Sequence, residues 1–389
     1  MQPMLPYREP KILEGYDALV NVLTEKNITE VILVTGSKIK ANGLTKELED
    51  RIKLYGINIT IFDKTTQNPT TQNVEDAVIE YNKNHCQAII AFGGGSVMDC
   101  AKALGARIAC PKRSLYAMRG LLRVKNKLPL LIAIPTTAGT GSETTLTAVL
   151  TDSKTNVKFT MNDFDLIPRY ALLDPKLTLG LPKEVTVNSG LDALTHAIEA
   201  FVGRATTMTT RKYALDAISL IFDNLPIAYA DGSNLKAREN MLEASYLAGL
   251  AFTKSYVGYA HAIGHAIGGK YKVAHGKAVA ISLPYCLNAY GKAVYTKLYK
   301  IGLHMDWVDE HTQKKEAAQI VINKLQAFND ELGIGNKLDQ IILKDTEYLA
   351  HLADKEANPL YPVPKQLSAR NLKSVIRCIR KGKIDLDKH

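Results

Sequence analysis

Short apolar, β-branched runs alternate with longer helical patterns in the first half of the chain. We expect strands at residues 31–35, 57–62, 88–92, 130–134, 146–151 and 170–173. Strands separated by helical segments are typical of βαβ units, which build a largely parallel sheet covered by helices. The pattern therefore predicts an α/β domain over residues 1–182, which ends near the pairs Asp174-Pro175 and Leu181-Pro182.

The pattern changes after Pro182, where apolar residues recur at helical spacing over long stretches. We expect helices at residues 185–202, 208–225, 237–253 and 314–332, and few strands. An all-helical domain over residues 183–389 then follows the α/β domain. Active sites often lie in a cleft between two domains, so we expect the active site there.

The chain carries a basic surplus, because 49 Lys and Arg residues against 39 Asp and Glu residues give a formal net charge of +10. Only the tail from Arg370 to Lys383 concentrates these charges, and there Leu372, Val375, Ile376 and Ile379 recur with a helical period. No aromatic residue or motif accompanies the charge. An amphipathic terminal helix with a solvated basic face is therefore favoured over a nucleic-acid surface.

The composition of the 389 residues, 46% hydrophobic and 23% charged, is globular and excludes collagen-like and disordered classes. No apolar run approaches the ~18 residues that a membrane span requires, so we expect neither a transmembrane helix nor a signal peptide. The five cysteines form no C-x-x-C pair, which argues against a disulfide framework and favours a reducing cytoplasm. Histidine and carboxylate must then hold any metal.

A glycine-rich turn, Gly93-Gly94-Gly95-Ser96, follows the strand expected at residues 88–92, and a helical pattern begins at Val97. Such a turn brings bare backbone N–H groups and the positive end of a helix dipole to one point, which suits a pyrophosphate. The G-x-G-x-x-G spacing is absent. A turn without a ligand therefore remains the alternative for this segment taken alone.

A second loop of small residues, Pro135–Glu143, follows the next core strand and carries several Thr and Ser hydroxyl groups. Two such loops at the ends of parallel strands indicate one ligand at the carboxyl edge of the sheet. The hydroxyl groups suit phosphate and ribose oxygens, whereas a connecting turn has little use for so many. Together the two loops predict a nucleotide or dinucleotide.

Candidate metal ligands gather in the second half of the chain. Asp192 and His196 stand at i and i+4, so both lie on one face of a helix. His261 and His265 repeat that spacing, and His275 follows ten residues later. An Asp–His pair is often only a surface pair, but the mostly apolar neighbours here make burial without a partner costly. A divalent first-row metal would supply the partner, with iron and zinc as the leading candidates.

With both halves considered, the chain resembles the iron-containing (group III, metal-dependent) alcohol dehydrogenase family over nearly its whole length. The matching segments are Gly93–Ser96 with Asp99, Thr136–Glu143, Asp174-Pro175, Asp192–Glu199, and Ala248-Gly249 through His261, His265, His275 and Gly276. The resemblance implies a Rossmann-like nucleotide domain followed by a helical metal domain. It also implies NAD(P)-linked oxidation of alcohols or reduction of aldehydes, and a homodimer.

The resemblance further implies the residues of the site. It implies Fe²⁺, or Zn²⁺, held by Asp192, His196, His261 and His275. It places the cofactor near Gly94, Gly95, Ser96, Asp99, Thr136, Thr137 and Lys158. Phe252 resembles an aromatic residue that lines the substrate channel, and His265 matches a nearby histidine that is not usually a ligand.

The chain departs from NAD-preferring members of the family at the end of its first strand. Those members often have an Asp there, whereas here Val34-Thr35 continues as Gly36-Ser37-Lys38-Ile39-Lys40. Absence of the carboxylate removes repulsion toward a ribose 2′-phosphate, and Ser37 with the nearby lysines adds donors. We therefore expect Gly36 and Ser37 to contact the cofactor, and NADP(H) to be favoured over NAD(H).

The expected reaction moves a hydride between a small primary alcohol or aldehyde and the nicotinamide, with the metal as Lewis acid on the substrate oxygen. Because the metal stabilises the oxyanion, no strong protein base is required. We interpret His265 as a relay of the proton to solvent, with a supporting role for the metal ligands as the alternative.

Other functions remain open at this point. A polyol dehydrogenase of the glycerol type would use zinc and a diol. Assays that compare glycerol with simple primary alcohols distinguish it from a dehydrogenase of simple primary alcohols. The dehydroquinate synthase class would need a basic phosphate pocket, which the apolar stretch near Phe252 does not suggest. A non-catalytic metal- or nucleotide-binding protein is disfavoured because all four expected ligands are present.

Overall fold

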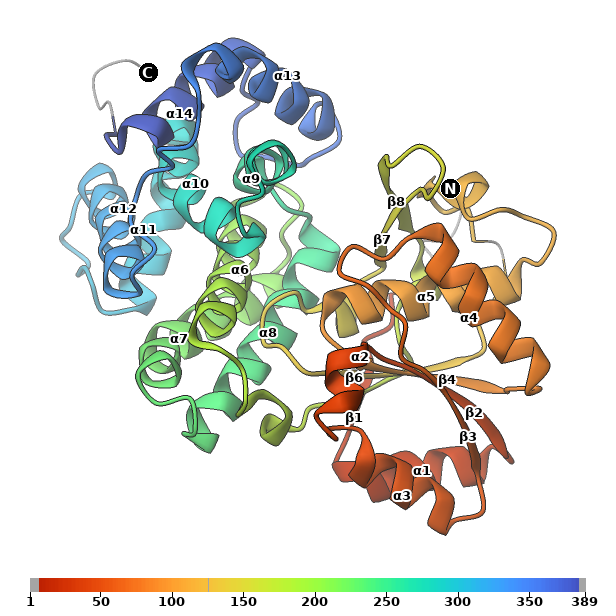
Figure 1. Ribbon diagram of the computed structural model, residues 1–389. Coiled ribbons are helices and arrows are strands. Elements are labelled where there is room, and N and C mark those ends of the chain that lie inside the picture. The colour runs from red at the N-terminus through yellow and green to blue at the C-terminus, as the bar shows by residue number, and fades with distance from the viewer. Residues whose placement is uncertain (1–6, 125, 385–389) are drawn as a thin grey trace. The chain divides into compact units, whose positions relative to one another are not determined.

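The computed structural model describes residues 7–124 and 126–384 and divides the chain into two compact units, Met1–Gly180 and Leu181–His389 (Figure 1). The first unit contains a parallel sheet with helices, and the described residues of the second unit form helices without strands. The predicted fold class, an α/β domain followed by an all-helical domain, is confirmed.

A six-stranded sheet lies at the centre of the first unit, with strand order β1-β9-β6-β4-β2-β3 and every pair parallel. The strands are β1 (Lys11–Leu13), β2 (Glu30–Val34), β3 (Asn58–Phe62), β4 (Ala88–Gly93), β6 (Leu130–Pro135) and β9 (Tyr170–Leu172). All of them except β1 match strands predicted from the apolar runs. Strand β1 has three residues, of which only Leu13 is buried, and so carries no readable pattern.

Helices cover both faces of this sheet (Figure 1). Along β2, Ile32 and Val34 pack into a core with the helices α4 and α5, while Val31 and Leu33 face a second core with α1 and α3. Strands buried on both faces are apolar throughout, which explains their continuous hydrophobic runs. The helices of this unit are α1 (Gly15–Glu25), α2 (Ser37–Ala41), α3 (Lys46–Leu54), α4 (Thr71–Lys83) and α5 (Gly95–Ala109), with 3₁₀ turns at Tyr116–Met118, Ser142–Thr144, Phe164–Leu166 and Pro175–Thr178.

One predicted strand lies outside the parallel sheet. Strand β7 (Thr147–Thr151) pairs antiparallel with β8 (Lys158–Asn162), and β8 pairs with the short β5 (Gly120–Leu121). The expectation that residues 146–151 join the parallel sheet is therefore wrong. Buried Ala148 and Leu150 alternate with partly exposed threonines and Val149, a pattern of period two that is typical of a strand covered on one face.

The strand order reverses between β2 and β4, because the chain moves outward from β2 to β3 and then returns to the other side of β2. Open α/β sheets bind ligands at the carboxyl ends of their strands at such a reversal. The segments after β2, β4 and β6 meet at this edge. Thr35 Oγ1 donates to Phe92 O at 2.8 Å, and Thr136 N donates to Gly93 O at 3.1 Å.

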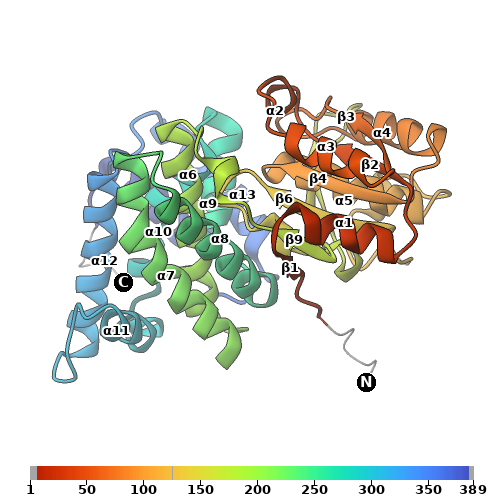
Figure 2. The same ribbon diagram turned by 90° about the horizontal axis from the view of Figure 1, so that it is seen from below.

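The second unit is a packed set of helices (Figure 2). Helices α6, α7 and α8 pack against one another, and α10 packs against α6 and α9. Within the described residues, no helix has both the length and the apolarity needed to cross a membrane. The helices are α6 (Lys183–Val202), α7 (Met208–Ala230), α8 (Leu235–Ser255), α9 (Tyr259–Tyr271), α10 (His275–Tyr290), α11 (Tyr295–His304), α12 (Lys314–Glu331), α13 (Thr346–Ala357) and α14 (Ala369–Lys381), with 3₁₀ turns at Gly291–Ala293 and Leu343–Asp345.

The four long helices predicted in this unit are confirmed as α6, α7, α8 and α12, and the predicted amphipathic terminal helix is α14. Its buried residues, Leu372, Val375, Ile376 and Ile379, are the four positions whose spacing predicts the helix. Basic residues on its other positions remain solvated or partly exposed. The tail is thus explained by packing within the second unit.

Helix α10 begins where its backbone touches α6. A Cβ atom placed on Gly276 would lie 1.8 Å from Asn188 O and 2.6 Å from the carbonyl carbon of the same residue. Backbone atoms cannot move aside as a flexible side chain can, so only glycine permits this approach. The contact sets His275, the first residue of α10, close to Asp192, one helical turn beyond Asn188 on α6.

We expect Gly276→Ala to lower the midpoint of thermal unfolding by roughly 3 to 10 °C, because overpacking against backbone costs about 1 to 3 kcal/mol. Gly269→Ala is the matched control, since a Cβ atom on Gly269 in α9 meets no atom within 4 Å. Its midpoint should stay within about 2 °C of the parent, because alanine suits a helix. Differential scanning calorimetry measures both variants. Equal midpoints for the two variants would contradict the close contact.

Candidate functional site

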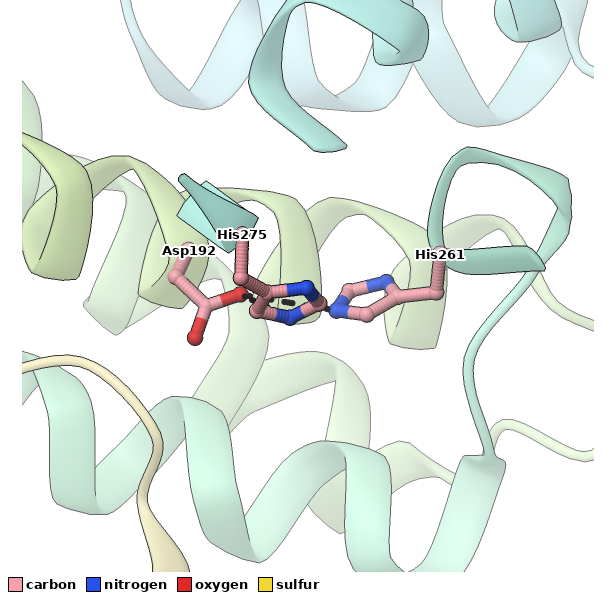
Figure 3. A group of neighbouring side chains, drawn as sticks. All are labelled: Asp192, His261 and His275. Atoms are coloured by element: carbon pink, nitrogen blue, oxygen red, sulfur yellow. Dashed lines mark ion pairs between the residues drawn. The ribbon is translucent and has the colours of Figure 1, made fainter. Parts of the chain in front are cut away.

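Three helices bring Asp192, His261 and His275 together (Figure 3). Asp192 comes from α6, His261 from α9 and His275 from α10, and their side chains extend toward one another. Asp192 Oδ1 lies 3.2 Å from His275 Nε2 and 3.6 Å from His261 Nε2. One ligand atom of each residue lies within 4.8 Å of the other two. The structure thus gathers residues from separate predicted segments into one group.

This group contains buried polar atoms that lack hydrogen bonds. Asp192 is 4% exposed and His261 is 2% exposed, whereas the side chain of His275 is 44% exposed. Among the described residues, Asp192 Oδ1 and His261 Nε2 have no hydrogen-bond partner of acceptable geometry. Such atoms are costly to bury without a partner, and a cation between them would satisfy both. One carboxylate with imidazole nitrogens is a donor set that suits a divalent first-row metal.

Glu199, which lies seven residues after Asp192 on α6, orients His261. The two atoms His261 Nδ1 and Glu199 Oε2 are 2.6 Å apart, and because an ionised carboxylate only accepts, Nδ1 donates the hydrogen. Glu199 also accepts from Gly258 N at 2.7 Å and Ala260 N at 2.8 Å. This arrangement presents His261 Nε2 to Asp192. The sequence motif includes Glu199, but its role rests on a contact between helices and has no local signal.

The charges of the group reinforce one another. Burial alone would raise the pKa of Asp192, but His196 and His275 outweigh it and hold that pKa well below its usual range. Burial likewise opposes protonation of His261, yet Asp192 and Glu199 outweigh it and raise the pKa of His261 to about 9. Two carboxylates therefore favour a positive charge here, which a bound metal supplies in place of the proton.

His196 lies beside this group but outside its compact arrangement. Its Nε2 is 4.0 Å from Asp192 Oδ1. Its ring stacks on Phe252 of α8, with centroids 4.0 Å apart, and on His261, with centroids 4.4 Å apart. The structure thus places His196 in contact with the candidate metal centre, and Phe252 against His196.

His265 is more open to solvent, with 45% of its side chain exposed. Its ring stacks on His275 at 5.1 Å between centroids, and its Nδ1 lies 2.7 Å from Glu356 Oε1. The same carboxylate oxygen accepts from Tyr361 OH at 2.7 Å. Because the carboxylate only accepts, Nδ1 is the donor in this pair. Glu356 and Tyr361 are distant in sequence, which explains why the sequence pattern does not reveal them.

In the first unit, glycines allow the two predicted phosphate loops to touch. A Cβ atom on Gly94 would lie 3.2 Å from Thr137 Oγ1, and one on Gly95 would lie 2.9 Å from Thr140 Cγ2. Helix α5 begins at Gly95, and Gly94 offers no side chain to cap it. An uncapped helix start beside a loop of hydroxyl groups is suited to bind a pyrophosphate.

Two further predicted residues meet at Asn68. Asn68 N donates to Ser96 Oγ at 3.4 Å, and Lys158 Nζ at the start of β8 donates to Asn68 Oδ1 at 2.7 Å. Residues that the resemblance assigns to one cofactor site, Ser96 and Lys158, are therefore linked through a single asparagine. No sequence pattern indicates Asn68 itself.

Gly36 and Ser37 lie at the carboxyl end of β2, where Gly36 precedes α2 with extended backbone. A Cβ atom on Gly36 would meet only Thr65 O, at 3.8 Å, so the position has room for a side chain. Lys40 is paired with Glu49 at 2.5 Å between Nζ and Oε1. The exposed donors of this segment are therefore Ser37 and Lys38 rather than Lys40.

Lys102 of α5 is fully buried and ties this helix to the end of the second loop and to the segment that follows it. Its Nζ donates to Ser142 Oγ at 3.0 Å, to Thr145 Oγ1 at 2.7 Å and to Thr147 O at 2.9 Å. A lysine inside the apolar helical stretch 97–104 is the sequence signal for such a role, since a buried ammonium needs several acceptors. No role for Lys102 is predicted from the sequence alone.

Two carboxyl groups share this environment with Lys102. Burial raises the pKa of Asp99 to about 7 and that of Glu143 to about 7, and it lowers the pKa of Lys102 to about 8. Glu143 Oε1 is buried without a hydrogen-bond partner in the described part of the chain. One ammonium group thus balances two carboxyl groups immediately behind the loops.

Comparison with known proteins matches this chain to two family models. The model described as iron-containing alcohol dehydrogenase matches residues 10–175, and that of the C-terminal part of the Fe-containing alcohol dehydrogenase family matches residues 186–379. Together they cover both units.

Individual relatives agree with the family models. The 1,3-propanediol dehydrogenase of Citrobacter freundii is 36% identical over 352 residues, which is 90% of this chain and 90% of that protein. The NAD-dependent methanol dehydrogenase of Bacillus methanolicus is 38% identical over 82% of this chain and 84% of that protein. A crystal structure of 1,3-propanediol oxidoreductase has a TM-score of 0.90 and 32% identity, and covers 96% of this chain and 99% of its own.

We expect Lys102→Met to lower the free energy of unfolding by roughly 3 to 5 kcal/mol at pH 7.5, because the change leaves two carboxyl groups buried without their cation. The loss should be smaller at pH 5.5. Lys102 lowers the pKa values of Asp99 and Glu143, so removing it should raise them further above the value of about 7 that each has in the parent. Both carboxyl groups are then protonated and uncharged in the folded variant at pH 5.5, and the missing cation costs less there. Chemical denaturation at both pH values measures the effect.

Lys83→Met, which removes an exposed lysine from α4, is the control and should change the free energy of unfolding by less than about 0.5 kcal/mol. A loss for Lys102→Met that is equal at the two pH values would show that the carboxyl groups do not respond to this lysine.

Proposed function

The chain belongs to the iron-containing alcohol dehydrogenase family, and we propose on that premise that it holds Fe²⁺ and favours NADP(H). It is an alcohol dehydrogenase and aldehyde reductase that uses a nicotinamide cofactor. We assign the cofactor to residues 1–182 and the metal to residues 183–389. The observation that carries the proposal is the group of Asp192, His261 and His275, in which the buried atoms Asp192 Oδ1 and His261 Nε2 lack hydrogen bonds and lie 3.6 Å apart.

The proposed ligands are these three residues with His196, and Zn²⁺ is the alternative metal. When bound, the metal supplies Lewis acidity at the substrate oxygen while the nicotinamide gives or takes the hydride. Glu199 accepts a hydrogen bond from Nδ1 of His261, so Nε2 of the neutral ring is directed toward the metal as the ligand atom. Asp192 is kept ionised by its imidazole neighbours and contributes the negative charge.

We assign proton transfer to His265. Glu356 and Tyr361 fix its ring, so that Nε2 is the nitrogen that takes up or releases the proton. The exposed fraction of the side chain, 45%, gives that nitrogen an exchange route with water. Support of His275 by ring stacking is the alternative role.

The proposed substrate is a small primary alcohol or aldehyde, and Phe252 is the proposed apolar wall of its pocket because its ring already packs on His196. The similarity to a 1,3-propanediol dehydrogenase favours a diol as the second candidate substrate. Rates with 1,3-propanediol, glycerol and simple primary alcohols separate the two candidates. The predicted cleft between the domains stays a prediction.

The cofactor proposal depends on the end of β2. Room and hydrogen-bond donors for a 2′-phosphate are provided there by Gly36, Ser37 and Lys38. We assign the pyrophosphate of the cofactor to a second group of residues, Gly94, Gly95, Ser96, Asp99, Thr136, Thr137 and Lys158. The methanol dehydrogenase relative is named for NAD, so discrimination between the two cofactors is the property to measure.

We also propose a homodimer in the cytoplasm. All five cysteines are free thiols, which suits a reducing compartment. The dimer rests on the family resemblance alone.

Chelation should abolish turnover, and Fe²⁺ or Zn²⁺ added to the metal-free protein should restore it, because the four proposed ligands bind metal only in the folded site.

His261→Ala should lose turnover, and no added metal should restore it. The cofactor should still bind to this variant, since the proposed cofactor residues lie in the other unit. Aldehyde-dependent oxidation of NADPH and NADH, metal content and cofactor fluorescence measure these properties. Full activity without detectable metal, or full metal content in His261→Ala, would refute the ligand assignment.

Gly36→Asp should lower the ratio of catalytic efficiency with NADPH to that with NADH by roughly ten-fold or more, since a carboxylate beside a 2′-phosphate costs about 1 to 3 kcal/mol. The backbone accepts the change, because Gly36 has a φ angle of −105° and Asp favours the position before a helix. Gly180→Asp is the control, as that exposed position has no atom within 4 Å of a new Cβ. An unchanged ratio in Gly36→Asp would remove the basis for NADP(H).

A further inference from the structure

A cavity of about 300 Å³ within the second unit is surrounded by positive charge. Its cationic side chains come from the connection just after α6, the first turn of α7 and the first two turns of α11. They are Arg204, Arg211, Lys297 and Lys300. The remaining lining residues are uncharged. The cavity is therefore a basic pocket. None of its lining residues belongs to the candidate metal centre.

These four cations lie in stretches of the chain that are poor in acidic residues. The segments that form the pocket contain no acidic residue between Glu199 and Asp216, and none between Glu243 and Asp306. Within the described part of the chain, none of the four cationic side chains takes part in an ion pair. Four like charges around one cavity repel one another unless an anion lies between them.

Existing hydrogen bonds hold two of the cations in place. Lys297 Nζ donates to Val202 O at 2.7 Å, at the end of α6, and so covers a carbonyl group that would repel an anion. Arg204 Nε donates to Val363 O at 2.7 Å. Arg211 differs, because its Nε is buried and has no hydrogen-bond partner among the described residues. A buried guanidinium donor without an acceptor points to a ligand that supplies one.

Two helix starts add to the positive potential. Helix α7 is 23 residues long and begins at Met208, and α11 is 10 residues long and begins at Tyr295 without a side-chain cap. The N-terminal ends of helices attract anions. Burial, together with Arg211 and Lys300, lowers the pKa of Lys297 to about 8, as expected where positive charge is not compensated.

We infer that this pocket binds a phosphate-class oxyanion, either inorganic phosphate or the phosphate group of a small phosphomonoester. Phosphate offers acceptors for the planar guanidinium of Arg211 and carries enough charge for several cations. The volume of about 300 Å³ accommodates either ligand. The inference is independent of the proposed substrate and cofactor.

Isothermal titration of inorganic phosphate into the metal-loaded protein tests the inference, with reduced cofactor present at saturation to fill the loops of the first unit. One binding site is expected. Arg211→Gln and Lys300→Gln should each weaken binding by roughly ten-fold to a hundred-fold, because each removes a charged hydrogen-bond donor. Lys212→Gln, an exposed neighbour outside the pocket, should bind phosphate as the parent does.

Thermal unfolding gives a second readout. Phosphate should raise the unfolding midpoint of the parent and of Lys212→Gln, and raise it less in the two pocket variants. Lys300 is exposed and takes part in no ion pair among the described residues, so Lys300→Gln keeps the test valid if Arg211→Gln does not fold. Competition with glycerol 3-phosphate distinguishes the sources, since tighter binding identifies a phosphomonoester and weaker binding identifies free phosphate. Absence of saturable binding at millimolar phosphate, or equal effects in all variants, would overturn the inference.

Discussion

The second unit depends on one constraint, the burial of the Asp192 carboxylate among imidazole rings. A buried carboxylate is stable only beside positive charge or hydrogen-bond donors, so α6, α9 and α10 must converge closely enough to surround it. Two glycines make that convergence sterically possible. Gly276 brings α10 against Asn188, and a Cβ atom on Gly258 would lie 2.7 Å from the Glu199 carboxylate. The metal chemistry of the family therefore rests on helix packing as much as on the ligands.

The first unit also buries a charged side chain, in this case the cation of Lys102. Its ammonium group donates to two hydroxyl groups and two carbonyl groups between Ser142 and Thr147. Because these acceptors belong to β7 and the residues just before it, one side chain fixes a separate small sheet against α5. In both units a buried charge with distant partners specifies which elements meet, which apolar packing alone does not do.

The pocket beside α6 shows the contrasting case, in which cations gather without forming an ion pair among the described residues. Arg204, Arg211, Lys297 and Lys300 line one cavity, and the neighbouring segments supply no carboxylate. Where Lys102 has acceptors from its own chain, Arg211 Nε has none among the described residues. That difference separates a charge used for folding from one available to a ligand.

The sequence by itself determined the features that depend on local periodicity. Apolar runs predicted the parallel strands, glycine turns predicted the two loops, and spacing of four residues put Asp192 and His196 on one helix face. Only the tertiary structure decided that β7 leaves the parallel sheet, that Glu199 orients His261 across 62 residues, and that Glu356 holds His265 across 91. A period of 2 or 3.6 residues specifies a face of a strand or helix, whereas contacts between distant residues depend on how whole elements pack.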